Sequence, residues 1–255
     1  SFQVAADWIA TIFDTYTIHN NPSTSVFQAD ATSLYIPNGV LICTDPPYYD
    51  NVPYADISDY FYIWLRPILS KIYPELFGTI LVPKDDELVA DTERFGGAEK
   101  ANQHFEEGFR KTFERIYSYH SRNWPMTVFY AFKQTETVKD EFTGKSNSKS
   151  GWESLLEGLI TSGYVINGTW PVRTERISRT RSLGSNALAS SIVLVCNPRD
   201  NNLGKISRRE FLLELRNDMP GALVEIQSAN IAPVDLAQAV IGPGMSVYSR
   251  YEKVL

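Results

Sequence analysis

An unbroken apolar run over residues 39–44 ends abruptly in the tetrapeptide Asp45-Pro46-Pro47-Tyr48. A short apolar run without polar alternation is typical of a parallel strand that is covered on both faces. Proline lacks an N–H and cannot continue a strand ladder, so the strand must stop at the motif. Ligands of open α/β sheets bind outside the carboxyl ends of the strands. The run therefore predicts an α/β fold with Asp45 at the ligand-binding edge.

The rest of the chain alternates between patterns of strand and helix. Apolar residues at helical spacing predict helices, of which the one over 98–120 has a stripe of Ala101, Phe105, Phe109, Phe113 and Ile116. The predicted helices cover 2–16, 58–73, 98–120, 152–161 and 208–216, and the predicted strands 25–29, 39–44, 126–132, 164–172 and 190–196. A turn is expected at 242–244 and a polar loop at 137–150. This alternation favours a sheet with helices on both faces.

Composition excludes several classes of protein. The 255 residues suffice for one large domain, and no apolar run reaches the roughly 18 residues of a membrane-spanning helix. Cys43 and Cys196 lie within apolar runs and are expected to be buried thiols of a reducing compartment, here the cytoplasm. The histidines, at 19, 104 and 120, lack the spacing of metal ligands, so no metal site is predicted.

The charge distribution is uneven. A net charge of −6 argues against a nonspecific nucleic-acid binder, which would carry excess lysine and arginine. However, the stretch 172–181 contains Arg173, Arg176, Arg179 and Arg181 against the single acid Glu175. A local basic patch on an acidic body therefore remains open.

The motif suits methylation of an exocyclic amine. The amino nitrogen of adenine or cytosine is a weak nucleophile because its lone pair is delocalised into the ring. Hydrogen bonds from its two N–H groups to the Asp45 carboxylate and the Pro46 carbonyl would favour a more tetrahedral, reactive nitrogen. The prolines fix that carbonyl in place. Tyr48 offers a ring face for stacking an extruded base, which is worth about 1–3 kcal/mol.

Asp45-Pro46-Pro47-Tyr48 resembles motif IV of the amino-methylating DNA methyltransferases. The longer stretch 44–65, TDPPYYDNVPYADISDYFYIWL, is similar to that of the large prokaryotic adenine-specific DNA methylases that carry a zinc ribbon. Further similar stretches are 129–134, 168–175, 185–196 and 230–238. The resemblance implies an S-adenosylmethionine-dependent enzyme that methylates adenine N6 of DNA. The Gly-rich cofactor loop of that family is absent from residues 1–44, so the chain resembles the C-terminal part of a longer enzyme.

The family's fold implies a partial Rossmann-like class I methyltransferase sheet. Its strand order is 3-2-1-4-5-7-6 with strand 7 antiparallel, and the predicted strands correspond to strands 3 to 7. The connection over 173–189 would then lie on the same edge as Asp45. The resemblance divides the chain into a catalytic domain at 1–200 and a C-terminal helical extension at 201–255.

Other site residues follow from the same resemblance. Asp30 and Ala31 match the position that approaches the cofactor's adenine, although Asp30 also suits the start of a loop. Asn51 and Tyr54 would close over the flipped base. Lys133, at the end of the neighbouring strand, would face that pocket. The four arginines at 173, 176, 179 and 181 would position DNA phosphates, unless they form a solvated hairpin tip.

Several alternatives stay open. Cytosine-N4 methylation uses the same chemistry, and an RNA or protein amide target is related, although Asp45 favours a base. The chain could also be a non-catalytic module that contributes DNA contacts or an assembly surface. Without strands 1 and 2, the strand over 39–44 has an unpaired edge, which is a liability. We expect this edge to be covered by the 25–29 strand, by a second copy of the chain, or by the missing N-terminal half.

Overall fold

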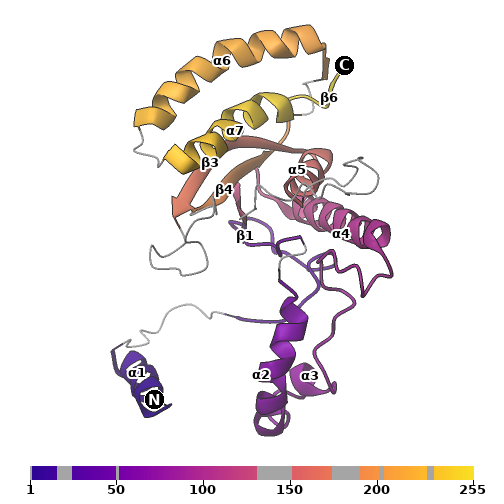
Figure 1. The fold of residues 1–255 in the computed structure, drawn as a ribbon, viewed down its shortest axis with the longest axis vertical. Helices are drawn as coiled ribbons and strands as arrows, with labels where there is room; N and C mark the ends of the chain where they lie inside the picture. The colour runs from indigo at the N-terminus through magenta and orange to yellow at the C-terminus, as the bar shows by residue number, and fades with distance from the viewer. Residues whose placement is uncertain are drawn as a thin grey trace, which may run out of the picture.

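A four-stranded mixed sheet organises the fold (Figure 1). The computed structural model describes residues 2–15, 25–49, 52–130, 151–173, 190–200, 204–228 and 233–255. The strands are β1 (Cys43–Thr44), β2 (Met126–Tyr130), β3 (Tyr164–Arg173) and β4 (Ser190–Pro198), in the order β1-β2-β4-β3. β1 is parallel to β2, whereas β4 is antiparallel to both β2 and β3. The predicted α/β class is confirmed.

Helices α4 (Ala98–Tyr119) and α5 (Gly151–Thr161) cover one face of the sheet. The predicted stripe of α4 is confirmed, since its five members are at most 6% exposed. Ile192, Leu194 and Cys196 of β4 belong to the same core. Successive strand residues point to opposite faces, so Val193 and Val195 belong to the other face.

Helix α7 (Pro233–Ser249) covers that opposite face and lies against β3. The turn predicted at 242–244 is wrong, because these residues continue the helix. Pro243 cannot donate to the carbonyl of Ala239, four residues earlier. The Thr169 hydroxyl of β3 donates to this carbonyl instead, at 3.4 Å. Gly242 permits the close approach, since a Cβ there would meet Thr169 Oγ1 at 1.8 Å.

The remaining C-terminal elements pack around α7. Helix α6 (Arg208–Ser228) lies beside α7, and β5 (Lys205–Ile206) pairs in parallel with β6 (Lys253–Val254). Ser207 and Glu210 form a capping box, in which each side chain bonds the other residue's backbone N–H at 3.2–3.3 Å. The predicted start of this helix at 208 is confirmed, but the helix continues beyond 216 to Ser228.

The N-terminal helices expose most of their apolar side chains, unlike α4 and α5. Helix α1 (Phe2–Thr15) confirms the predicted helix, and α2 (Tyr54–Leu69) begins four residues earlier than predicted. Figure 1 shows α2 and the short α3 (Pro74–Phe77) on the side of the sheet away from α7. Among the buried residues of α2 are Ala55 and Tyr62, whereas Trp64 is 67% exposed.

Three expectations about the sheet edge are wrong. Residues 25–29 form no strand and are exposed. The turn that follows them is instead bound to α4, where Arg115 Nε donates to the carbonyl of Leu34 at 2.9 Å. The strand predicted over 39–44 is limited to Cys43–Thr44 and is not covered on both faces, since Leu41 is 60% exposed. Cys43 of β1 is exposed, whereas Cys196 is buried as predicted. No strand among the described residues pairs with the outer edge of β1, so its cover by another chain or segment stays a prediction.

Candidate functional site

The motif Asp45-Pro46-Pro47-Tyr48 leaves β1 at the carboxyl edge of the sheet. Asp45 is exposed, and the next three residues are half-buried. The Tyr48 hydroxyl donates a hydrogen bond to Asp45 Oδ1 at 3.2 Å. The Tyr48 ring meets the ring of Tyr130, the last residue of β2, edge to face at 5.4 Å. Two neighbouring strand ends therefore support one carboxylate and one half-exposed aromatic ring.

Tyr49 anchors the chain directly after the motif. Its φ of +21° lies at the border of the left-handed region, which is uncommon for a residue with a side chain. Its ring packs edge to face on Phe105 of α4, and its hydroxyl donates to Asn102 Oδ1. The N-terminus of α5 approaches closely, since a Cβ on Gly151 would meet Tyr49 Cβ at 2.5 Å. The helices of the core thus fix the exit of the motif.

Tyr54, the first residue of α2, lies near the motif. Partial burial raises the pKa of the Tyr54 hydroxyl, and the negative charges of Asp45 and Glu87 raise it further. The hydroxyl is therefore a neutral donor at neutral pH. Tyr48 is thus hydrogen-bonded to Asp45, and the charge of Asp45 acts on Tyr54. The role of Tyr54 over a flipped base stays a prediction, and Asn51 lies outside the described residues.

Asp30 and Ala31 lie elsewhere. Asp30 Oδ1 accepts from the Thr32 N–H at 2.9 Å, and Oδ2 accepts from the Thr32 hydroxyl at 2.6 Å. These bonds lower the pKa of Asp30. The Asp30 turn meets α4 at Arg115, whereas Tyr49 meets it at Asn102. Thirteen helical residues span about 20 Å, so the structure does not bring Asp30 to the motif.

The strand directions place the start of the arginine run at the motif's edge. β3 runs parallel to β1, so Arg173, at the end of β3, lies on the edge where Asp45 leaves the sheet. Three strand spacings separate β1 from β3, or about 14 Å. The side chain of Arg173 is not described, and Lys133, Arg176, Arg179 and Arg181 lie outside the described residues.

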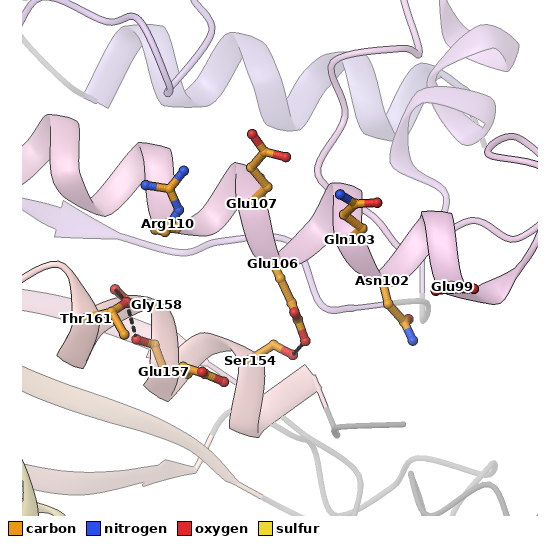
Figure 2. Close-up of a pocket in the computed structure, with 10 residues that line it drawn as sticks. All are labelled: Glu99, Asn102, Gln103, Glu106, Glu107, Arg110, Ser154, Glu157, Gly158 and Thr161. Atoms are coloured by element: carbon orange, nitrogen blue, oxygen red, sulfur yellow. Dashed lines mark hydrogen bonds between the residues drawn. The ribbon is translucent and has the colours of Figure 1, made fainter. Parts of the chain in front are cut away.

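A cavity of about 730 Å³ lies between α4 and α5 (Figure 2). Its walls carry four glutamates and a single basic residue, Arg110. The lining residues are Glu99, Asn102, Gln103, Glu106, Glu107, Arg110, Ser154, Glu157, Gly158 and Thr161. Ser154 donates to Glu106 Oε1 at 3.2 Å across the gap between the helices. The sequence analysis did not find this cavity, because glutamates on the polar face of a helix look like an ordinary solvated surface.

The histidines that the structure describes have local partners. The His104 ring stacks on Phe95 at 4.1 Å, and its Nε2 is 3.0 Å from the carbonyl oxygen of Glu87. His120 Nδ1 is 3.1 Å from the Tyr164 hydroxyl. Within the described part of the chain, no group of three or more histidine, cysteine, aspartate or glutamate side chains is placed to hold a metal ion. None of the helices described is long and apolar enough to cross a membrane.

Comparison with known proteins gives no relative: no family model, curated protein or solved structure matches this chain.

Proposed function

We propose that this chain carries the base-handling part of an S-adenosylmethionine-dependent DNA methyltransferase that acts on adenine N6 of a flipped base. One observation carries the proposal. Asp45-Pro46-Pro47-Tyr48 follows a strand at the carboxyl edge of a mixed sheet, with the carboxylate exposed and an aromatic ring hydrogen-bonded to it. Acceptors and a stacking surface at such an edge suit an aromatic amine.

The sheet order supports the proposal. The order β1-β2-β4-β3, with β4 antiparallel to its neighbours, corresponds to strands 4-5-7-6 of the class I methyltransferase sheet. With this correspondence the motif would follow strand 4, as the resemblance implies. It also directs β3 and its terminal Arg173 toward the same edge.

Each residue of the motif has a role in this mechanism. Tyr48 donates to Asp45 Oδ1, so Oδ2 is the oxygen that would accept one hydrogen of the substrate amino group. The Pro46 carbonyl would accept the other hydrogen, and its position varies little because the proline ring restricts φ. Together they orient the nitrogen lone pair for in-line attack on a methyl group, and such orientation supplies much of the catalysis. The half-exposed ring of Tyr48 would stack on the base.

S-adenosylmethionine would supply the methyl group as the donor substrate. Both oxygens of Asp30 accept hydrogen bonds within their own turn. The turn and Tyr49 contact α4 at points about 20 Å apart along the helix. A role for Asp30 and Ala31 in donor binding stays a prediction, and no step is derived for this pair.

Methyl transfer from labelled S-adenosylmethionine to DNA by the full-length protein tests the proposal. We expect Asp45→Ala to abolish transfer, because the amine loses its charged acceptor. Asp14→Ala, which removes an exposed carboxylate of α1, should leave the rate unchanged. Nucleoside analysis of the product separates N6-methyladenine from N4-methylcytosine, the closest alternative. A wild-type rate in Asp45→Ala would remove Asp45 from the mechanism.

A non-catalytic role is the second candidate, favoured by the apolar side chains that α1 and α2 expose. In this case the chain would contribute DNA contacts or an assembly surface and would act only with a complementary half. Calorimetric titration with S-adenosylmethionine should show weak or no binding by this chain alone. Asp45→Ala in the full-length protein separates the two candidates, because it abolishes methyl transfer only if this chain handles the base.

A further inference from the structure

The 82–95 segment holds the chain on both sides of the residues that follow the motif. On one side, the Ala90 N–H donates to the carbonyl of Tyr49 at 2.9 Å. On the other, the Ala55 N–H at the start of α2 donates to Glu87 Oε1 at 2.9 Å. Residues 50–53 lie between these two attachment points. One segment, distant in sequence from the motif, therefore fixes the separation between Tyr49 and α2.

Arg94 is the centre of this attachment. Its Nη1 donates to Glu87 Oε2 at 2.9 Å and to the Lys84 carbonyl at 3.0 Å. Its Nη2 donates to Asp56 Oδ2, in the first turn of α2, at 2.9 Å. The side chains of Arg94 and Glu87 are each 13% exposed. A guanidinium suits this position, because its planar fork can bind several acceptors at once.

The start of α2 depends on these contacts because it has no cap of its own. Its N-cap residue is Pro53, which makes no side-chain hydrogen bond. The first N–H groups of a helix have no partner within the helix, and Glu87 supplies one from outside. The negative charges of Glu87 and Asp56 also interact favourably with the helix N-terminus. Without Arg94, these two carboxylates would repel each other at this point.

We propose that Arg94 is a positioning residue for the methyl transfer, acting through Glu87 and Asp56 to hold the first turn of α2, with Tyr54, in a fixed place relative to Tyr49 at the exit of the motif. The inference rests on the proposed function and adds to it a group outside the motif. Tyr54 begins α2 directly before the residue that Glu87 binds, so any shift of the first turn moves Tyr54 relative to the carboxylate. Arg94 does not touch the base; its effect is to keep the acceptor site in one geometry.

Steady-state kinetics of Arg94→Gln test this role. We expect kcat to fall roughly 10- to 100-fold, because small misplacement of reacting groups costs rates of this order. The KM for DNA should change less than about twofold, since phosphate contacts dominate affinity. Arg94→Lys keeps the charge and should restore part of kcat. Arg250→Gln, which removes an exposed arginine paired with Asp218 of α6, is the matched control and should change neither constant.

Amide hydrogen exchange supplies a readout that does not need activity. In Arg94→Gln, peptides covering 49–57 should exchange faster, while peptides of α4 keep their protection. If Arg94→Gln does not fold, Asp56→Asn provides the same test from the other end of the ion pair.

The outcomes separate the two proposals. A wild-type kcat in Arg94→Gln, or an equal loss in Arg250→Gln, overturns the positioning role while methyl transfer stands. A wild-type full-length protein that methylates no DNA overturns the proposed function, and the positioning role falls with it.

Discussion

The sheet with α4, α5 and α7 covers its apolar side chains, whereas α1 and α2 expose theirs. Phe109 of α4 is 2% exposed, but Phe61 of α2 is 59% exposed and Trp8 of α1 is 71% exposed. The two regions use the same residue types, so the difference lies in what packs against them. An apolar stripe on one face of α4 meets a sheet, while α2 is apolar around most of its circumference and contacts α3 and the 77–95 segment.

Contacts within the described chain leave most large apolar side chains of α1 and α2 exposed to solvent. A helix that is apolar on all sides is normally buried. Exposed apolar patches larger than a few hundred Å² typically mark a surface that meets another protein or a membrane. The exposed side chains of α1 and α2 are therefore a second surface that another chain could cover. The cover expected for the edge of β1 stays a separate prediction.

The largest expected contrast is between the two thiols. At pH 8, Cys43 should react with a disulfide reagent at the rate of an exposed thiol. Cys196 should react at least about 1,000-fold more slowly, because it becomes accessible only when a core of ordinary stability opens. Counting the reacted thiols in native and denatured protein checks this. Two fast thiols in the native protein would show that β4 is not held in the core.

The same thiol gives a pH dependence. Burial raises the pKa of Cys196 from 9.0 to about 12. A raised pKa in the folded state means that the native protein binds more protons than the unfolded one above pH 9. This contribution to stability is complete below pH 9 and is lost as the pH rises to about 12. Cys196→Ala should flatten the decrease in denaturant midpoint over this range.

Two phenylalanine truncations compare the regions directly. Phe109→Ala should lower the free energy of unfolding by about 3–5 kcal/mol, because it leaves a cavity between α4 and the sheet. Phe61→Ala should change it by less than about 0.5 kcal/mol, as at an exposed position. Denaturant unfolding of both variants measures the pair. Similar losses would mean that α2 is covered in solution.

The sequence was a good guide to those elements that depend on the spacing of residues within one short segment. The stripe of α4 and the break at Asp45-Pro46-Pro47 depend on local spacing, and both were placed correctly. The strand at 25–29 was wrong because strand formation requires a partner, and residues 34–36 bind α4 and the core instead. The helix through 242–244 was missed because Thr169, distant in sequence, satisfies the carbonyl that Pro243 leaves unpaired.

In the candidate site, too, only the part that depends on local sequence could be predicted. The motif's position followed from the strand that precedes it. The roles of Arg94 and Glu87 could not be found, since nothing in their local sequence indicates that they bind α2. Only the folded chain brings them to the residues after the motif.

A smaller effect is expected where α7 packs against β3. Gly242→Ala should lower the free energy of unfolding by about 1–3 kcal/mol, because the new methyl group would overlap Thr169. Gly244→Ala is the matched control: nothing lies within 4 Å of a Cβ there, and alanine favours the helix. Thermal unfolding of both variants distinguishes them. Combining Gly242→Ala with Thr169→Ala should recover part of the loss, and a loss that is unchanged would place the strain elsewhere.

The smallest effect is expected at α1. Trp8→Ser removes a large side chain that is 71% exposed, and the described side chains of α1 are almost all exposed. The free energy of unfolding should therefore change by less than about 0.5 kcal/mol. Denaturant unfolding at two protein concentrations measures it and separates folding from association. A loss above 1 kcal/mol at both concentrations would mean that α1 packs on its own chain in solution, and the contrast between the two regions would then be confined to α2. A loss seen only at the higher concentration would instead indicate that Trp8 lies in a contact between copies.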